Sequence, residues 1–342
     1  MNRLPRGLQA RGESLTTLDE KETVLEVQDL QTHFRTKFGT VKAVDGVSFS
    51  LKRGETMGIV GESGSGKSVT VLSLMRLVPI PPGEIVGGKI ILDGEDILEL
   101  SELDMVKVRG SKIAMILQDP MTSLNPVFQV GNQVGEAIHI HQKLQGNTLL
   151  DRIISVLRQV RIPAAEARIK DYPHQLSGGM RQRVVGAISI SCEPKVLIAD
   201  EPTTSLDATV QAQYLKLLRD IQEELDTAIV FITHDLGIVA KMCDKVAVMY
   251  AGRIVETGNV RDIFYNPRHP YTEALLGSLP RLDVDVNRLD SIPGQPPALH
   301  NLPAGCPFAP RCKYAMDKCL EEYPPTYTLN EGHSARCWRL EE

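Results

Sequence analysis

The sequence predicts an α/β protein with a parallel sheet, because short apolar runs and helical segments alternate along the chain. Runs at 113–119, 196–200 and 228–235 are continuously apolar and only a few residues long, as strands buried on both faces are. A helical block lies between the first two runs. Strands that are separated by helices are typical of a parallel sheet, which is therefore the expected core.

The remaining elements follow in chain order from the same kinds of pattern. Residues 24–34 and 41–51 alternate apolar and polar side chains, which predicts paired strands with one buried face. Residues 55–61 form a short apolar strand that runs into a glycine-rich turn, and a helix over 67–78 follows. The proline-rich tail predicts irregular structure. The other expected elements are a helical insertion at about 122–180, with helices over 130–143 and 149–160, and short strands over 244–258.

Composition and charge limit the classes of protein to which the 342-residue chain can belong. Its formal net charge of −5 and pI near 6.0 argue against a general nucleic-acid binder, which usually carries a basic excess. Residues 1–22 lack the apolar stretch of a secretory signal, and their mixed charge predicts a flexible extension. No apolar run approaches the ~20 residues that span a bilayer, so we expect a soluble or peripheral protein with reduced thiols.

The sequence GESGSGKS at 61–68 has the spacing of a phosphate-binding loop, G-x-x-x-x-G-K-[ST]. Gly61, Gly64 and Gly66 let the backbone approach phosphates closely, so that its N–H groups can donate to them. Lys67 can reach the β- and γ-phosphates, and the Ser68 hydroxyl can bind Mg²⁺. The alternative, a chance glycine-rich turn, is disfavoured because a strand precedes the motif and a helix follows it. We therefore expect a nucleotide site.

Two adjacent carboxylates follow the apolar run VLIA at 196–199. Asp200 lies at the predicted end of a buried strand and can hold Mg²⁺, while Glu201 can act near the attacking water. Such an acidic pair is a weak signal alone, because solvated acids are common in loops. It becomes strong together with the phosphate-binding loop.

The motif LSGGMRQR at 176–183 completes a recognisable order of elements. Together with the phosphate-binding loop, Gln118, the acidic pair, SLD at 205–207 and His234, it resembles the ATP-binding cassette (ABC) ATPase family over residues 24–258. The resemblance implies an α/β P-loop NTPase domain with a RecA-like core, an antiparallel β subdomain and a helical subdomain. It also implies that two such domains enclose two ATP molecules head to tail.

In the family this motif binds the ATP of the opposing subunit. Ser177, Gly178 and Gly179 are expected to open a helix, and so to present free N–H groups to a γ-phosphate. Met180 departs from the pattern, since the family most often has Gln there. The backbone donors before it are unchanged, so we expect this half-site to remain competent.

The resemblance also implies roles for individual residues. Glu201 would polarise the attacking water, and His234 would contact that water and the γ-phosphate. Asp207 would contact the opposing subunit, and Phe34 would stack on adenine, with Phe38 as a weaker candidate. Ser68, Gln118 and Asp200 would hold Mg²⁺, and Gln118 would relay the nucleotide state to a membrane partner. The residues expected to bind ATP within the chain are Phe34, Gly61, Glu62, Ser63, Gly64, Ser65, Gly66, Lys67, Ser68, Val69, Gln118 and Asp200.

The tail narrows the function further. A single cassette with no heptad-bearing insertion fits an importer whose permeases are separate chains better than a repair or translation ATPase. Segments 266–280 and 292–312, which contain HPYT and GCPFAPRC, resemble the C-terminal extension of oligopeptide, dipeptide and nickel importer ATPases. The resemblance implies ATP-driven import of short peptides. Nickel or sugar import is an alternative within the same family, and a soluble non-transport ATPase is a more distant one.

This resemblance also implies the partners and the domain organisation. The expected partners are a homologous ATPase subunit in a heterodimer, two membrane permeases and an extracytoplasmic binding protein, with no nucleic acid. The expected location is the cytoplasmic face of the cell membrane. The expected divisions are an N-terminal extension at 1–22, the nucleotide-binding domain at 23–262 and a small irregular C-terminal extension at 263–342.

Four cysteines in the tail, Cys306, Cys312, Cys319 and Cys337, have the spacing C-x₅-C-x₆-C-x₁₇-C. A reducing compartment disfavours disulfides, and zinc prefers closer C-x₂₋₄-C pairs. A Cys₄ [4Fe–4S] cluster accepts looser spacing, and members of the resembling group carry such a cluster in this tail. We therefore expect an iron–sulfur cluster, with Zn²⁺ or four unconnected thiols as the alternatives.

Overall fold

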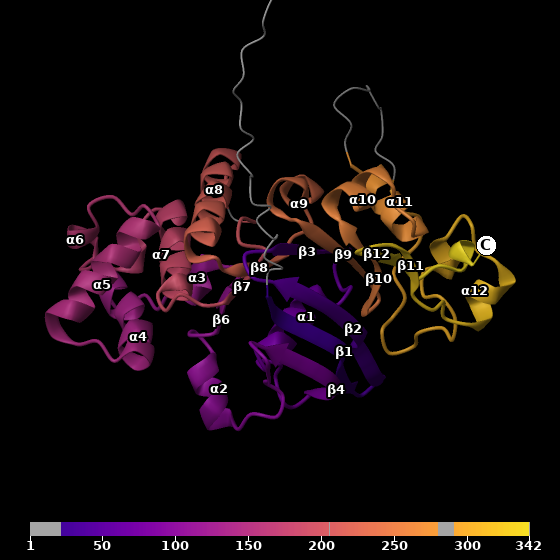
Figure 1. Cartoon of the computed structure of the whole chain (residues 1–342), viewed down its shortest axis with the longest axis horizontal. Helices are drawn as coiled ribbons and strands as arrows, with labels where there is room; N and C mark the ends of the chain where they lie inside the picture. Colours follow the sequence, from indigo (N-terminus) through magenta and orange to yellow (C-terminus); the bar gives the residue numbers. More distant parts are fainter. Residues whose placement is uncertain (1–21, 205, 280–290, 342) are drawn as a thin grey trace, which may run out of the picture.

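The computed structural model describes residues 22–204, 206–279 and 291–341. The predicted N-terminal extension at 1–22, apart from its last residue, lies outside this range. Figure 1 shows the described elements spread along the longest axis of the molecule. Helices α4–α6 lie at one end, the sheets occupy the centre, and the C-terminal segment with α12 lies at the other end.

The first sheet is antiparallel and four-stranded, in the order β2-β1-β4-β5. Its two long strands pair from the Thr36–Gly39 turn outward, and one face of each is buried, as the alternating sequence predicts. This sheet is the expected antiparallel β subdomain. Its strands are β1 (Thr23–Thr36), β2 (Gly39–Lys52), β4 (Gly83–Leu92) and β5 (Glu95–Asp96).

The second sheet has eight strands in the order β11-β12-β10-β9-β3-β8-β7-β6. Strands β6, β7, β8, β3 and β9 are parallel, whereas β10, β12 and β11 continue the sheet antiparallel. The predicted parallel core is thus confirmed. The strands are β3 (Thr56–Val60), β6 (Ile113–Ile116), β7 (Val196–Asp200), β8 (Ala228–Ile232), β9 (Lys245–Tyr250), β10 (Arg253–Asn259), β11 (Tyr327–Asn330) and β12 (His333–Ala335).

The helices connect these strands and cover the large sheet, and the expected helical insertion corresponds to the run from α3 to α7 (Figure 1). Among the helices of the described ranges, none is long and apolar enough to cross a membrane. The helices are α1 (Lys67–Leu74), α2 (Glu102–Val108), α3 (Pro120–Ser123), α4 (Val130–Gln142), α5 (Gly146–Gln159), α6 (Ala165–Arg168), α7 (Gly178–Ile190), α8 (Ala208–Leu225), α9 (Leu236–Met242), α10 (Val260–Tyr265), α11 (Pro270–Gly277) and α12 (Asp317–Glu321), with short 3₁₀ turns at Pro173–Gln175, Ala309–Arg311 and Trp338–Leu340.

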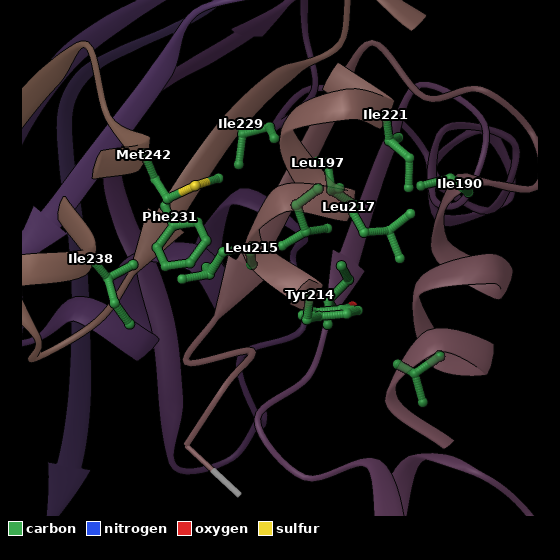
Figure 2. Packing of buried hydrophobic residues seen from close by; sticks show 14 of the residues in the cluster. Ile190, Leu197, Tyr214, Leu215, Leu217, Ile221, Ile229, Phe231, Ile238 and Met242 are labelled. Atoms are coloured by element: carbon green, nitrogen blue, oxygen red, sulfur yellow. The ribbon is translucent and has the colours of Figure 1, made fainter. Parts of the chain in front are cut away.

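The largest buried cluster lies between the parallel strands and the helices that cover them. Figure 2 shows Leu197 of β7 and Phe231 of β8 among side chains of α8, including Tyr214 and Leu217. All four side chains are almost completely buried. Truncating a side chain buried in this way lowers the free energy of unfolding by about 2–5 kcal/mol. This packing therefore fixes the positions of the strands whose ends carry the acidic pair.

The helix predicted over 67–78 is shorter than expected, since α1 ends at Leu74. Arg76 adopts a left-handed conformation with φ 50°, and Pro79 follows two residues after Leu77. Proline disfavours helical backbone in the residue before it, so the apolar run to residue 78 cannot continue as a helix. Its side chains still pack in the core, because Met75 and Val78 are buried.

The C-terminal segment is more regular than the sequence suggested. Its strand β12 pairs with β10 of the main sheet, and α12 precedes β11. The buried Glu256 carboxylate also ties this segment to the sheet. It accepts hydrogen bonds from the backbone N–H groups of Arg268 (2.8 Å) and His269 (2.9 Å), and it lies 2.9 Å from Nε2 of His333. The buried ring of His269 accepts a hydrogen bond from the N–H of Tyr271 through Nδ1.

Candidate functional site

The predicted site residues follow the carboxyl ends of neighbouring parallel strands. The phosphate-binding loop follows β3, the acidic pair ends β7, His234 follows β8 and Gln118 follows β6. Because the strands are parallel and adjacent, their carboxyl ends meet at one edge of the sheet. The topology therefore assembles residues that are far apart in the sequence.

Glycine is required at two positions of the phosphate-binding loop. Gly61 and Gly66 have φ of 152° and 105°, and a Cβ at either would lie 2.1–2.2 Å from a backbone carbonyl oxygen. The loop curls around Lys67, whose Nζ donates to the carbonyls of Gly61 (2.8 Å) and Glu62 (3.0 Å). Burial lowers the pKa of Lys67, and the nearby carboxylates of Glu201, Asp200 and Glu62 oppose that shift. The loop thus holds the buried ammonium group of Lys67 where phosphates are expected to bind.

The Glu201 carboxylate is the meeting point of the expected catalytic groups. Gln118 Nε2 donates to Oε2 at 3.1 Å, and the Thr204 hydroxyl donates to the same oxygen at 2.9 Å. The ring nitrogen Nδ1 of His234 lies 3.3 Å from the other carboxylate oxygen. His234, the other predicted partner of the attacking water, and Gln118, the predicted Mg²⁺ sensor, therefore both contact Glu201.

The backbone of Glu201 is also held in an unusual conformation. Its φ of 46° is left-handed, which is costly for a residue other than glycine. The Glu201 N–H donates to the Ile232 carbonyl at 2.9 Å, which ties the residue to the neighbouring strand β8. The surrounding structure fixes the direction of this carboxylate.

Asp200 has the features of a metal ligand. Its side chain is buried, and its Oδ1 makes no hydrogen bond within the described part of the chain. Burial and the charge of Glu201 raise the pKa of Asp200, and the hydrogen bond with Ser68 and the charge of Lys67 oppose that shift. A bound cation would relieve both penalties, because it supplies the missing partner and the opposite charge. Asp200, Ser68 and Gln118 therefore fit Mg²⁺.

Most of the residues expected to bind ATP line one cavity of about 660 Å³. Phe34 lies on its wall, whereas Phe38, with 73% of its surface exposed, is absent from it. Among the residues expected to bind ATP, Gly61, Glu62, Ser65 and Asp200 are absent from this lining. The cavity is lined by Phe34, Val41, Ala43, Ser63, Gly64, Gly66, Lys67, Ser68, Val69, Gln118, Glu201, His234 and Leu299.

Leu299 is a lining residue that sequence reasoning missed. It comes from the C-terminal segment, and its carbonyl accepts a hydrogen bond from the N–H of Lys42 in β2. The contact spans more than 250 residues, and no local pattern marks it. The C-terminal segment thus contributes to the wall of the nucleotide cavity.

The other predicted ATP-contacting motif lies apart from this cavity. Ser177 caps α7, and its hydroxyl accepts from the N–H of Met180 at 3.3 Å. Gly178 and Gly179 form the first turn, as predicted, but none of these residues lines the cavity of its own chain. Asp207 is exposed and caps α8. A role for these residues toward a second subunit stays a prediction.

The four tail cysteines surround one small apolar cavity beside Phe308 and Trp338. All four are free thiols, and the Cys306 N–H donates to the Cys319 carbonyl at 2.8 Å. Burial raises the pKa of Cys306 to about 11 and also raises those of Cys312 and Cys337. Within the described ranges, no group of three or more His, Cys, Asp or Glu side chains could hold a metal ion as arranged. The expected iron–sulfur cluster and its zinc alternative therefore have the right donors but no matching geometry.

Comparison with known proteins explains the two parts of the chain. The family model "ABC transporter" matches residues 44–204, and the model "Oligopeptide/dipeptide transporter, C-terminal region" matches residues 255–319. The oligopeptide transport ATP-binding protein OppD of Bacillus subtilis is 52% identical over 93% of this chain and 89% of its own length. The chain belongs to the ABC transporter ATPase family. The dipeptide transport ATP-binding protein DppD of Bacillus subtilis is 51% identical, over 93% of this chain and 95% of its own.

Solved ABC ATPases have the same fold. The structure of cbiO1 from Clostridium perfringens, part of the ABC transporter complex cbiONQ, is 32% identical with a TM-score of 0.62, and covers 72% of this chain and 92% of that one. A dimeric ATP-binding cassette bound to ADP and Pi also gives a TM-score of 0.62, over 69% of this chain and 99% of that one. At 23% identity, the second likeness shows the fold alone.

Proposed function

We propose that this chain hydrolyses ATP to drive the import of short peptides through a membrane transporter. The observation that carries the proposal is the combination of a complete ATP site with a C-terminal region of the oligopeptide/dipeptide transporter type. That region lines the ATP cavity through Leu299, so it is part of the ATPase. The names of two relatives reported above, OppD and DppD, support peptides as the transported substrate.

The chemistry follows from the positions of the side chains. The phosphate-binding loop would hold the triphosphate by its N–H groups, with Lys67 on the outer phosphates. Mg²⁺, held by Ser68, Gln118 and Asp200, would neutralise charge on the phosphate oxygens. The Glu201 carboxylate would accept a proton from the attacking water, and His234 would orient that water and contact the γ-phosphate.

The proposal includes a second ATPase subunit and a membrane complex. Ser177 to Met180 would supply N–H donors to the partner's ATP, and Asp207 would contact that partner, which we expect to be a homologous but different chain. The segment that follows Gln118 carries the exposed apolar residues Val127 and Phe128, which favour a permease contact there. We therefore place the chain peripherally on the cytoplasmic face of the membrane, with two permeases and an extracytoplasmic binding protein as its partners.

Reconstituted transport tests this function. The complex in vesicles should take up labelled di- and oligopeptides only with ATP, and excess unlabelled peptide should compete for uptake. Uptake of nickel or sugar that excess peptide does not inhibit would instead assign the chain to a nickel or sugar importer of the same family. ATP hydrolysis by the chain alone, without association with a membrane complex, would identify a soluble ATPase instead.

The [4Fe–4S] cluster at Cys306, Cys312, Cys319 and Cys337 also stays a prediction, since four thiols around one cavity supply the donor chemistry but not the arrangement. We assign it no step in hydrolysis. Anaerobic purification with metal analysis and a visible spectrum tests it. Iron, sulfide and a broad visible absorption would support the cluster, one zinc in a colourless protein would support Zn²⁺, and metal-free protein would leave four thiols.

A further inference from the structure

Arg311, in the C-terminal segment, reaches the phosphate-binding loop. Its side chain is only 4% exposed and forms a two-pronged ion pair with Glu62, with N–O distances of 2.7 and 2.9 Å. Its Nε also donates to the Pro293 carbonyl at 2.9 Å, and Nη1 donates to the Tyr250 hydroxyl at 3.2 Å. These contacts fix a buried guanidinium on several sides and hold it against Glu62 of the phosphate-binding loop.

Glu62 is the second residue of the phosphate-binding loop and is held at three points. Its carboxylate pairs with Arg311, and its N–H donates to the Tyr271 hydroxyl at 2.8 Å. Its carbonyl accepts from Lys67 at 3.0 Å. Two of the three restraints come from the region after residue 262. The conformation of the loop around Lys67 therefore depends on the C-terminal region.

The ion pair also neutralises the negative charge of Glu62 near the expected phosphate site. A triphosphate is strongly anionic, and an unpaired Glu62 carboxylate on the same short loop would repel it. Arg311 neutralises that carboxylate without lining the cavity itself. A planar guanidinium suits this task, since it grips both carboxylate oxygens and stays charged.

We propose that Arg311 is a positioning residue of the ATP site, which fixes the phosphate-binding loop and cancels the charge of Glu62. The proposal goes beyond the ATP contacts described above, because Arg311 touches no phosphate and acts through Glu62. It depends on the ATPase assignment but not on peptides as the substrate. It gives the C-terminal region a direct part in ATP affinity.

A double-mutant cycle tests this role in the assembled transporter. ATP affinity is measured with a fluorescent ATP analogue, and KM and kcat for ATP are measured alongside, for Arg311→Met, Glu62→Gln and the double variant. Because loss of Arg311 leaves the partly exposed Glu62 carboxylate unpaired on the phosphate-binding loop, Arg311→Met should weaken ATP binding about tenfold and raise KM with little change in kcat. In the Glu62→Gln background, the same change should weaken binding less than about twofold, because no charge is left to cancel.

Arg336→Met provides the matched control. Arg336 lies in the same segment but contacts Thr326 and the Tyr323 ring, so ATP affinity should be unchanged. If Arg311→Met folds poorly, Arg311→Lys keeps the charge without the two-pronged geometry and should show an intermediate loss. If Arg311→Met lowers ATP affinity by the same factor with and without the Glu62 carboxylate, or does not lower it at all, the proposal is overturned. A wild-type complex that does not bind ATP would overturn the ATPase assignment as well.

Discussion

Replacement of Glu201 by Gln should retain ATP binding and nearly abolish hydrolysis. The structure shows why this substitution is selective. The two hydrogen bonds from Gln118 and Thr204 converge on Oε2, so an amide oxygen at that position keeps both. The amide nitrogen then takes the place of Oε1 and can donate to Nδ1 of His234, 3.3 Å away. The hydrogen-bonded frame survives, and only the charge and the proton acceptor are lost.

The expected size of the effect follows from that single loss. General base catalysis contributes about 10² to 10⁴ in rate, so we expect turnover to fall by about 10³-fold. This corresponds to about 4 kcal/mol of activation free energy. Because no residue that holds the phosphates changes, the dissociation constant for ATP should stay within about threefold of wild type.

The assay is ATP hydrolysis by the assembled complex, measured with equilibrium ATP binding on the same samples. Glu166→Gln provides a matched control, because this exposed carboxylate on α6 pairs with Arg158 far from the cavity and should leave turnover unchanged. Turnover of the Glu201 variant near the wild-type rate would remove Glu201 as the base. A large loss of ATP affinity would contradict the view that the hydrogen-bonded frame survives.

Three further variants test other parts of the structure. Lys67→Ala should weaken nucleotide binding as well as abolish turnover, and an unchanged affinity in equilibrium binding would count against the phosphate-binding loop. Leu299→Ala should weaken ATP binding about fivefold by removing apolar surface from the cavity wall; an affinity equal to wild type would show that ATP does not reach this wall. Gly58→Ala should destabilise the chain by about 1–3 kcal/mol, because its Cβ would lie 2.9 Å from the Cys243 sulfur. Thermal unfolding measures that loss, and failure of a second change, Cys243→Ala, to restore part of it would refute the steric explanation.

The ATP site was predictable because its residues lie in short local patterns. A glycine-rich loop between a strand and a helix, and an acidic pair after an apolar run, indicate function from their immediate neighbours. The parallel order of the strands then requires these patterns to meet at one sheet edge, as Gln118, Glu201 and His234 do. Here local sequence and topology lead to the same conclusion.

The contacts of the C-terminal region could not be predicted in this way. Arg311 and Glu62 are 249 residues apart, and neither has a neighbourhood that marks an ion pair. The HPYT and GCPFAPRC segments indicated a family, but Tyr271 and Arg311 within them also restrain the phosphate-binding loop. The strands β11 and β12 are only four and three residues long, and so short a stretch carries little alternation. Such pairings are set by tertiary packing.

The place of β12 beside β10 has a consequence for how the protein is made. Ribosomes release the chain from its N-terminus, so β10, which ends at Asn259, emerges long before its partner at His333–Ala335. Until then the growing chain presents an unpaired strand edge, the kind of surface that recruits other strands. The ion pair between Glu62 and Arg311 is delayed in the same way. Chains that end prematurely within the tail should therefore aggregate, and the newly made ATPase should gain its full ATP affinity only when synthesis is almost complete.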